Sequence, residues 1–446
     1  MDQVIPPAAP GSVTDVISSA GAPAGTRAVE DVQHSAHGEH TGPAATPPGF
    51  VPKVFLAQFG LFGALMTPVL VTMALRVAEV DPDNKTSSLS LVLGVGAIFA
   101  LIANPLVGRL SDRTTSRLGR RRPWLIGGVV GGLTGLALIA FVPSIPVILL
   151  GWIITQICYN ASLATLQATV PDQVAHRDRG KVSGALGVAL TLAIVVSATL
   201  AGQVADARVQ FLVPAVLAIV LVGCFAVTME DKPLATAPEP FSVKEFAGSF
   251  WTNPVEHRDF GWAWVSKFLV TFGMIAPTSY LAYYLTADFG VSDSEVAAKV
   301  STLIVITYLC NAGAAAVSGW LSDRVGARKP FILGSSLVVV AGLVVLALAP
   351  GFTAVVLAQV LIGLGGGMFY AVDLALVTEV LPDPDTAAKD LGVMNIANAL
   401  PQSLAPAVVS VVLVVAGGEN YPLFFAVAAA LAAVGALSVT RIRGIR

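Results

Sequence analysis

Charged residues are scarce in this sequence. Asp, Glu, Lys and Arg make up 12% of the 446 residues, whereas soluble proteins carry roughly 25%. Hydrophobic residues make up 55%, and the mean hydropathy is +0.77. The composition therefore excludes an ordinary soluble domain and indicates a membrane protein. The formal net charge of −2 gives no indication of nucleic-acid binding.

Residues that commonly carry chemistry are also scarce. Cys158, Cys224 and Cys310 lie in apolar runs without the spacing of metal ligands, so we expect them to be small buried hydrophobes. The sequence contains no nucleophile–His–acid set, HExxH, Walker motif or glycine-rich nucleotide fingerprint. We therefore expect neither an enzyme nor a bound cofactor or metal ion.

Long apolar runs fill most of the remaining chain. A membrane-spanning helix needs ~20 mostly apolar residues, and twelve runs meet this length. They lie near residues 54–77, 88–110, 124–142, 146–170, 181–204, 210–229, 259–286, 296–320, 331–349, 353–380, 391–416 and 421–440. The sequence therefore predicts an all-α membrane protein with twelve spans.

Basic residues alternate between the predicted loops. The loops after spans 2, 4 and 8 and the C-terminus carry Arg and Lys clusters, so the positive-inside rule predicts that these loops and both termini are cytoplasmic. The polar stretch 230–258 is expected to be a central cytoplasmic loop. The expected units are a disordered tail (1–50), two six-helix bundles (51–229 and 259–440) on either side of that loop, and a short basic tail (441–446).

One six-residue motif occurs twice. Residues 108–113 read Gly-Arg-Leu-Ser-Asp-Arg and residues 319–324 read Gly-Trp-Leu-Ser-Asp-Arg, and each copy precedes a basic cluster and a proline. At the same offset, Tyr159 matches Tyr370. The repeat predicts a doubled membrane unit, a design that is common in transporters with a site between their halves.

The first copy, between spans 2 and 3, resembles the signature of the major facilitator superfamily. Its longer form, with residues 116–123 reading Ser-Arg-Leu-Gly-Arg-Arg-Arg-Pro, is similar to the glycoside–pentoside–hexuronide symporters and the sucrose/solute-carrier-45 group. Residues 395–402, reading Asn-Ile-Ala-Asn-Ala-Leu-Pro-Gln, resemble the same branch. The resemblance implies two pseudo-symmetric six-helix bundles that rock about a cavity lined by spans 1, 4, 7 and 10.

The resemblance also implies that the motif latches the cytoplasmic face in the outward-open state. Asp112 ends a predicted helix, and we expect it to meet Arg113, Arg117 and the N–H groups of a neighbouring helix start, where a carboxylate gains roughly 0.3–1 kcal/mol. Alternatively, the arginines fix topology and contact anionic lipid. The second copy is expected to be the weaker latch. The expected latch residues are Gly108, Asp112, Arg113, Arg117, Arg120, Gly319, Asp323 and Arg324.

Two ionisable side chains lie inside predicted spans, where charges are rare and usually functional. Lys267 on span 7 and Asp373 on span 10 both lie roughly 10–12 Å from the cytoplasmic boundary, at 1.5 Å per residue. We predict an ion pair that either holds the two spans together or opens when substrate or a proton arrives. Span 2 lacks the carboxylates of sodium-coupled relatives, and Gln167 stands where plant-type sucrose symporters have an arginine. The coupling ion of neither group of relatives can therefore be assigned to this protein from the resemblance. If protons couple, Asp373 is the best-placed acid.

Amide side chains share one face of spans 4 and 11. Such amides suit sugar hydroxyls, and the alternative is hydrogen bonding between helices. Tyr280, Tyr283 and Tyr284 on span 7 favour an interfacial aromatic belt over sugar stacking. The glycines at 363–367 allow either a gate or a tight helix contact. The candidate substrate-binding or coupling residues are Gln58, Gln156, Tyr159, Asn160, Gln167, Lys267, Tyr370, Asp373, Asn395, Asn398 and Gln402.

These patterns favour a secondary active transporter of a small polar solute, with a sugar or glycoside as cargo and a proton as the coupling ion. We expect a monomer in the cell membrane (inner or plasma) with a small-molecule substrate and no nucleic-acid partner. Two alternatives stay open: an exporter of apolar, drug-like compounds, and a non-transporting membrane sensor. The amide-rich faces favour the sugar.

Overall fold

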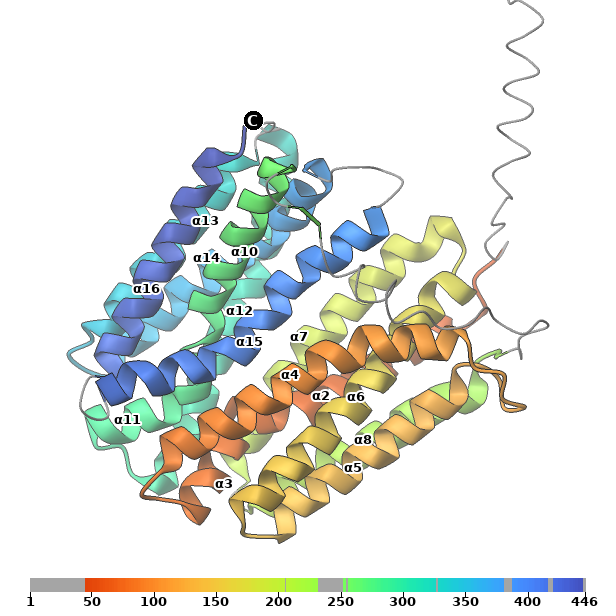
Figure 1. Ribbon diagram of the computed structural model, residues 1–446, viewed down its shortest axis with the longest axis horizontal. Helices are drawn as coiled ribbons and strands as arrows, with labels where there is room; N and C mark the ends of the chain where they lie inside the picture. Colours follow the sequence, from red (N-terminus) through yellow and green to blue (C-terminus); the bar gives the residue numbers. More distant parts are fainter. Residues whose placement is uncertain are drawn as a thin grey trace, which may run out of the picture.

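The computed structural model describes residues 45–204, 206–231, 252–253, 256–325, 328–380, 387–415 and 420–443 (Figure 1). Every regular element in these ranges is a helix. The first half contains α2 (Phe50–Thr67), η1 (Pro68–Thr72), α3 (Met73–Val80), α4 (Lys85–Asp112), α5 (Arg122–Phe141), α6 (Ile145–Gln173), η2 (His176–Asp178), α7 (Arg179–Gln203) and α8 (Ala207–Thr228). The second half contains α10 (Arg258–Ile275), η3 (Thr278–Tyr280), α11 (Leu281–Phe289), α12 (Asp293–Val325), α13 (Lys329–Ala347), α14 (Phe352–Glu379), α15 (Ala387–Val415), α16 (Tyr421–Ser438) and η5 (Val439–Arg441).

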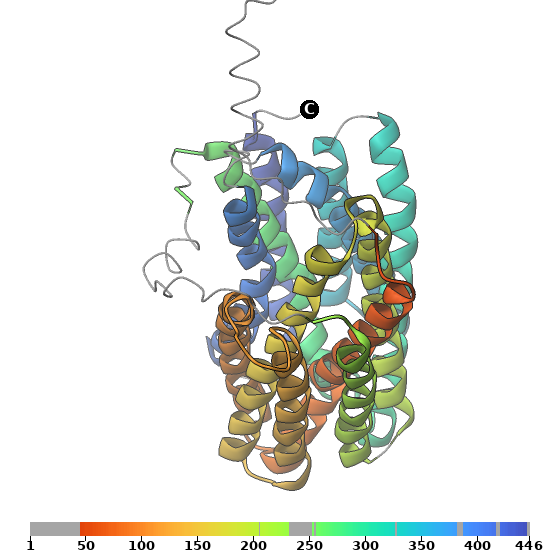
Figure 2. The same cartoon turned by 90° about the vertical axis from the view of Figure 1, so that its right-hand side faces the viewer.

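The helices confirm the predicted all-α membrane fold. Within the described ranges, 11 helical segments are long and apolar enough to cross a membrane, and they match eleven of the twelve predicted spans. The remaining predicted span, 391–416, coincides with α15, a helix of 29 residues of which several side chains lie outside the described set. Figure 2 shows that the helices run roughly along one common direction, as membrane-spanning helices do.

Spans 1 and 7 are each interrupted after a proline. In span 1, Pro68 begins a π-helical turn, which separates α2 from α3. In span 7, Pro277 is followed by the 3₁₀ turn η3, which separates α10 from α11. Proline has no N–H to donate to the preceding turn, which weakens the helix at these two points. Both breaks follow a Phe-Gly pair, at 62–63 and 272–273, and they therefore extend the internal repeat into the first span of each half.

Glycines let neighbouring helices approach closely, as small residues do in membrane bundles. A side chain at Gly132 of α5 would overlap the ring of Tyr159 on α6. In the second half, side chains at Gly363 and Gly367 of α14 would overlap the α12 backbone at Thr307 and Asn311. Of the two interpretations of the glycine run in span 10, the structure therefore shows the tight helix contact.

Two pairs of long helices make the most extensive contacts between the halves. The helix α4 runs beside α15, and α7 packs against α12 (Figure 1). The end of the bundle that carries both motif copies, at 108–113 and 319–324, is called the motif end below. The other end, which carries the loops at 81–84 and 290–292, is called the distal end. This arrangement puts the repeated motifs at one end of the bundle and a different set of contacts at the other.

Candidate transport site and motif network

Lys267 and Asp373 form the ion pair that the sequence predicts. The Nζ of Lys267 on α10 lies 2.6 Å from the Oδ2 of Asp373 on α14, and the two side chains are 8% and 7% exposed. An isolated charge at this depth would be costly, so each group needs the other. Tyr370 lies one turn before Asp373 on α14 and is exposed. The pair therefore joins spans 7 and 10 inside the second half.

The amide residues of span 4 contact each other. The Nδ2 of Asn160 donates to the backbone oxygen of Gln156 at 2.8 Å and to its Oε1 at 3.0 Å, and both side chains are buried. Gln58 on α2 is also buried, and its Oε1 has no hydrogen-bond partner within the described part of the protein. Gln167, farther along α6, is exposed. Of the three amide residues on the predicted face of span 4, Gln156 and Asn160 thus contact each other, and Gln167 lies apart from them.

The remaining candidates fall in different surroundings. Tyr159 is fully buried and packs against Gly132 of α5, whereas its repeat partner Tyr370 is 41% exposed. On α15, Asn395 is exposed and Asn398 is half-buried. The side chain of Gln402 lies outside the described residues. The position of Tyr159 between α5 and α6 favours helix packing over contact with a solute.

The three tyrosines of span 7 do not form an interfacial belt, and that prediction is wrong. Tyr280, Tyr283 and Tyr284 are all buried inside the protein. Two of their hydroxyls reach across the boundary between the halves. Tyr280 lies 2.6 Å from the Oγ of Ser90, and Tyr283 donates to the backbone oxygen of Ala74 at 2.8 Å. The prediction failed because depth in the membrane does not say which face of a helix a residue occupies.

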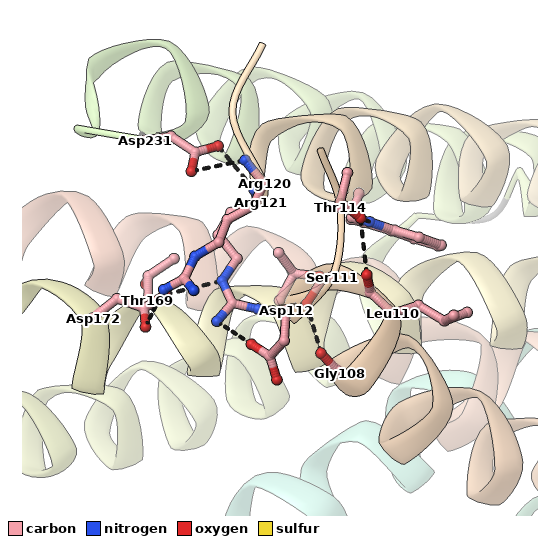
Figure 3. A network of polar contacts seen from close by, with 12 residues as sticks. Gly108, Leu110, Ser111, Asp112, Thr114, Arg120, Arg121, Thr169, Asp172 and Asp231 are labelled. Atoms are coloured by element: carbon pink, nitrogen blue, oxygen red, sulfur yellow. Dashed lines mark hydrogen bonds and ion pairs between the residues drawn. The ribbon is translucent and has the colours of Figure 1, made fainter. Parts of the chain in front are cut away.

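Arg121 is the centre of the first motif's polar network (Figure 3). Its buried guanidinium lies 2.5 Å from Asp112, donates to the Oγ of Ser111 at 2.5 Å and donates to Asp172 of α6 at 3.0 Å. Arg120 adds an ion pair of 2.6 Å to Asp172. Charge-assisted contacts of this kind are stronger than neutral hydrogen bonds. The network therefore ties α4, the start of α5 and α6 together within the first half.

Arg121 is a partner of Asp112 that was not expected from the sequence. The expected partners, Arg113 and Arg117, are nearer in the chain, and Arg117 is exposed. The turn between α4 and α5 instead brings Arg121 back over the end of α4. The second copy contained a usable signal, since aligning the prolines that end both basic clusters matches Arg121 to Arg328.

A reciprocal pair of caps joins α5 to α8. The carboxylate of Asp231 accepts the backbone N–H groups of Arg120, Arg121 and Arg122 at 3.1, 2.8 and 2.8 Å, at the positive end of α5 (Figure 3). The side chain of Arg122 donates to the oxygen of Met229, just past the end of α8, at 2.6 Å. Gly119 has φ +101°, and a side chain there would overlap Asp231. The glycine of the basic cluster is thus required by backbone conformation and by space.

The second copy repeats this arrangement with different residues. Arg328 donates to the Oγ of Ser322 at 2.9 Å, as Arg121 does to Ser111. Lys329 donates to the backbone oxygen of Ile442, just past η5, at 2.5 Å. Each motif therefore anchors to the last span of its own half. In the second copy, Arg324 is exposed, Gly319 has only one heavy atom near its Cβ position, at 3.9 Å, and the Asp323 side chain lies outside the described residues.

A two-part bundle of membrane-spanning helices, with a buried ion pair inside and a repeated polar network at one end, is the architecture of a multi-pass membrane transporter. The Major Facilitator Superfamily matches residues 54–298 and 263–444. The chain belongs to this superfamily.

Similarity to individual proteins is confined to short stretches. The chain is 40% identical over 72 residues to an uncharacterized symporter of Synechocystis, covering 16% of this chain and 13% of that protein. It is 42% identical over 82 residues to the human proton-associated sugar transporter A, covering 18% of this chain and 10% of that protein. Mouse solute carrier family 45 member 3 is 36% identical over 86 residues, covering 19% and 15%. These relatives agree with the branch that the sequence motifs resemble.

Solved structures share the fold over most of the chain. The nucleoside transporter NupG has a TM-score of 0.69 at 15% identity, covering 88% of this chain and 99% of that one. A bacterial homologue of the human lysosomal transporter Spinster has a TM-score of 0.64 at 13% identity, covering 89% and 99%. At these identities the likeness shows the fold alone.

Proposed function

We propose that this protein is a secondary active transporter that moves a sugar or glycoside by alternating access, coupled to proton symport. The observation that carries the proposal is the Lys267–Asp373 pair, with 2.6 Å between Nζ and Oδ2, buried between two spans of a major facilitator fold. Ionisable groups at membrane depth usually serve the movement of substrate or ions. The names of two similar proteins, a proton-associated sugar transporter and a symporter, support the same cargo and coupling.

The ion pair gives a physical route to coupling. Protonation of Asp373 removes the negative charge that compensates Lys267. A buried ammonium without its counter-charge is strongly unfavourable. Sugar hydroxyls can accept hydrogen bonds from the released ammonium, which reduces that cost in the loaded state. Proton and sugar are therefore bound together, as symport requires.

The amides of the first half support a neutral, hydroxyl-rich cargo. Because Asn160 donates its Nδ2 to Gln156, the Oδ1 of Asn160 and the Nε2 of Gln156 remain to accept from and donate to a solute. The buried Oε1 of Gln58 adds an acceptor without a partner among the described residues. Leaving such an oxygen unpaired costs about 1–3 kcal/mol, and a sugar hydroxyl would offset that cost.

Spacing along the boundary helices supports alternating access. Ser90 of α4 meets Tyr280 across the boundary, and Gly108 lies 18 residues later, about five turns along the same face. On α7, Gly202 packs against Ser301 of the other half, and Gly184 lies 18 residues earlier on the same face. A side chain at Gly108 or Gly184 would meet no heavy atom within 4 Å. Each helix thus has one small residue that contacts the other half, Ser90 on α4 and Gly202 on α7. Each also has a glycine about 27 Å away, Gly108 or Gly184, that contacts nothing there.

Gly108 and Gly184 lie at the motif end, which supports the proposed latch. Asp112 has a 54% exposed side chain although it contacts Arg121, so it can accept a further partner when this end closes. The latch set is Gly108, Asp112, Arg113, Arg117, Arg120, Gly319, Asp323 and Arg324. The positive-inside rule, applied to the basic loops, supports a cytoplasmic position of this end and of both termini in a cell membrane. The two halves are residues 51–229 and 259–440 of a monomer.

Reconstitution into proteoliposomes tests this proposal. A panel of radiolabelled mono- and disaccharides is offered with and without an inward proton gradient. We expect accumulation of at least one sugar, collapse of that accumulation on addition of a protonophore, and a raised KM in Gln156→Ala. Absence of sugar-dependent flux under every gradient would overturn the proposal. Proton-driven extrusion of an apolar dye from the same vesicles would replace it with an exporter.

A further inference from the structure

Three tyrosine hydroxyls from the second half reach backbone and side chains of the first half at the distal end. The Oη of Tyr280 on η3 lies 2.6 Å from the Oγ of Ser90 on α4. The Oη of Tyr421 on α16 lies 3.2 Å from the Oγ1 of Thr86, one turn earlier on α4. The third, Tyr283 on α11, donates to the backbone oxygen of Ala74 on α3. The three contacts therefore join the halves at one end of the bundle.

The contact between Tyr280 and Ser90 has a defined direction. The Oγ of Ser90 donates its proton to the backbone oxygen of Thr86 at 2.7 Å, so it receives the proton of the tyrosine hydroxyl. Tyr280 is fully buried and Ser90 is 6% exposed, so no water replaces this bond while the distal end stays closed. Removing the tyrosine hydroxyl would leave Ser90 with its own donor bond intact. A Tyr280→Phe variant therefore removes the contact without leaving an unpaired donor.

Tyr283 adds two interactions with the first half. Besides the 2.8 Å bond to Ala74, its ring lies under the Nζ of Lys85, 5.4 Å from the centroid. Its ring also meets that of Tyr280 edge to face, with centroids 6.4 Å apart. The ring contact therefore stabilises the positions of Tyr280 and Tyr283, from which both contact the first half.

We propose that Tyr280, Tyr283 and Tyr421 form a clasp that holds the distal entrance shut, and that its hydrogen bonds break each time the transporter opens to that side. The inference rests on the proposed alternating access, because only relative motion of the halves separates these atoms. Neutral hydroxyl contacts suit this task, since water replaces each bond when the entrance opens. The clasp residues position the halves and do not need to touch the cargo.

Tyr284 provides a matched control in the same helix. It is buried like its neighbours, but its hydroxyl donates to the backbone oxygen of Leu346 on α13 at 2.9 Å, inside the second half. Opening the distal entrance leaves this bond unchanged. Loss of the Tyr284 hydroxyl should therefore lower stability without changing the balance between open and closed states.

Double electron–electron resonance on the full-length protein in nanodiscs tests the clasp without any substrate. Spin labels at Asp83→Cys and Ser292→Cys, both exposed and on opposite halves of the distal end, report the width of the entrance after the three native cysteines are replaced by alanine. For Tyr280→Phe and for Tyr283→Phe we expect the open-to-closed ratio to rise about fivefold, the equivalent of ~1 kcal/mol for one hydrogen bond. The double variant should shift it further, and Tyr284→Phe should leave it unchanged.

A second variant approaches the contact from the other half. Ser90→Ala should raise the same ratio, and combining it with Tyr280→Phe should add little, because both remove one bond. Unchanged distances in Tyr280→Phe, Tyr283→Phe and Ser90→Ala would overturn the clasp, as would an equal shift in Tyr284→Phe. Because this readout needs no cargo, the expected shifts would uphold the clasp even where the sugar flux experiment fails.

Discussion

Removing one member of the Lys267–Asp373 pair should be far more harmful than removing both. Two unit charges 2.6 Å apart attract by about 6 kcal/mol at an effective dielectric constant of about 20. Burying each ion costs several kcal/mol, so the pair roughly balances its own desolvation. Deleting one partner leaves the other charge uncompensated, at a cost of about 3–5 kcal/mol. The double apolar variant Lys267→Met/Asp373→Leu carries no such penalty.

The assay combines thermal unfolding in detergent with two transport measurements in proteoliposomes. We expect Asp373→Ala and Lys267→Ala to unfold at lower temperature than the protein itself, and Lys267→Met/Asp373→Leu to unfold close to it. If the pair also couples, the double variant should exchange sugar across the membrane but fail to accumulate it against a gradient. A purely structural pair would leave accumulation intact in this variant.

Two results would refute this reasoning. Single variants that are as stable as the original protein would show that the pair is not buried as an interdependent unit. Full proton-driven accumulation in the double variant would remove the pair from the coupling mechanism. The charge swap Lys267→Asp/Asp373→Lys separates the cases further, because it keeps the attraction but moves the proton-binding carboxylate to span 7.

Three other variants test separate parts of the structure. Asp231→Asn should lower the free energy of unfolding by about 1–3 kcal/mol, because a charged cap on three N–H groups becomes neutral; unchanged chemical denaturation would contradict this. Gly108→Leu should leave stability unchanged but slow transport by blocking closure of the motif end, whereas Gly127→Leu, at an exposed position of α5 with equal space, should transport normally. Asn160→Ala should raise KM for sugar more than it lowers kcat, and an unchanged KM would make the contact with Gln156 purely structural.

The fold was predictable because each span carries its own signal. Roughly 20 apolar residues must form a helix in a bilayer, whatever the neighbouring helices do. The ion pair was predictable for a related reason: Lys267 and Asp373 lie at one depth, and a lone charge there is expensive. Both inferences depend on the membrane as solvent and need no knowledge of side-chain direction.

The features that could not be predicted from the sequence all depend on the direction in which a side chain or a loop points. Depth placed Tyr280 and Tyr283 at a boundary, but only the packed structure shows that they face the other half instead of lipid. Likewise Asp112 and Arg121 are separated by a loop whose path decides which arginine returns to the end of α4. Tyr159 and Tyr370 match in the repeat but differ in burial, so equivalent positions do not guarantee equivalent surroundings.

The two ends of the boundary between the halves use different chemistry. At the distal end, three hydrogen bonds of neutral hydroxyl groups cross the boundary, and water can replace each of them at little cost. At the motif end, the charged groups are tied within each half, through Arg121 and Arg122 in the first and Lys329 in the second. Each motif therefore forms a preassembled surface of its own half. In the proposed alternating access, closing the motif end would require only that two such surfaces meet, which would use both the glycine and the charged cluster of each copy.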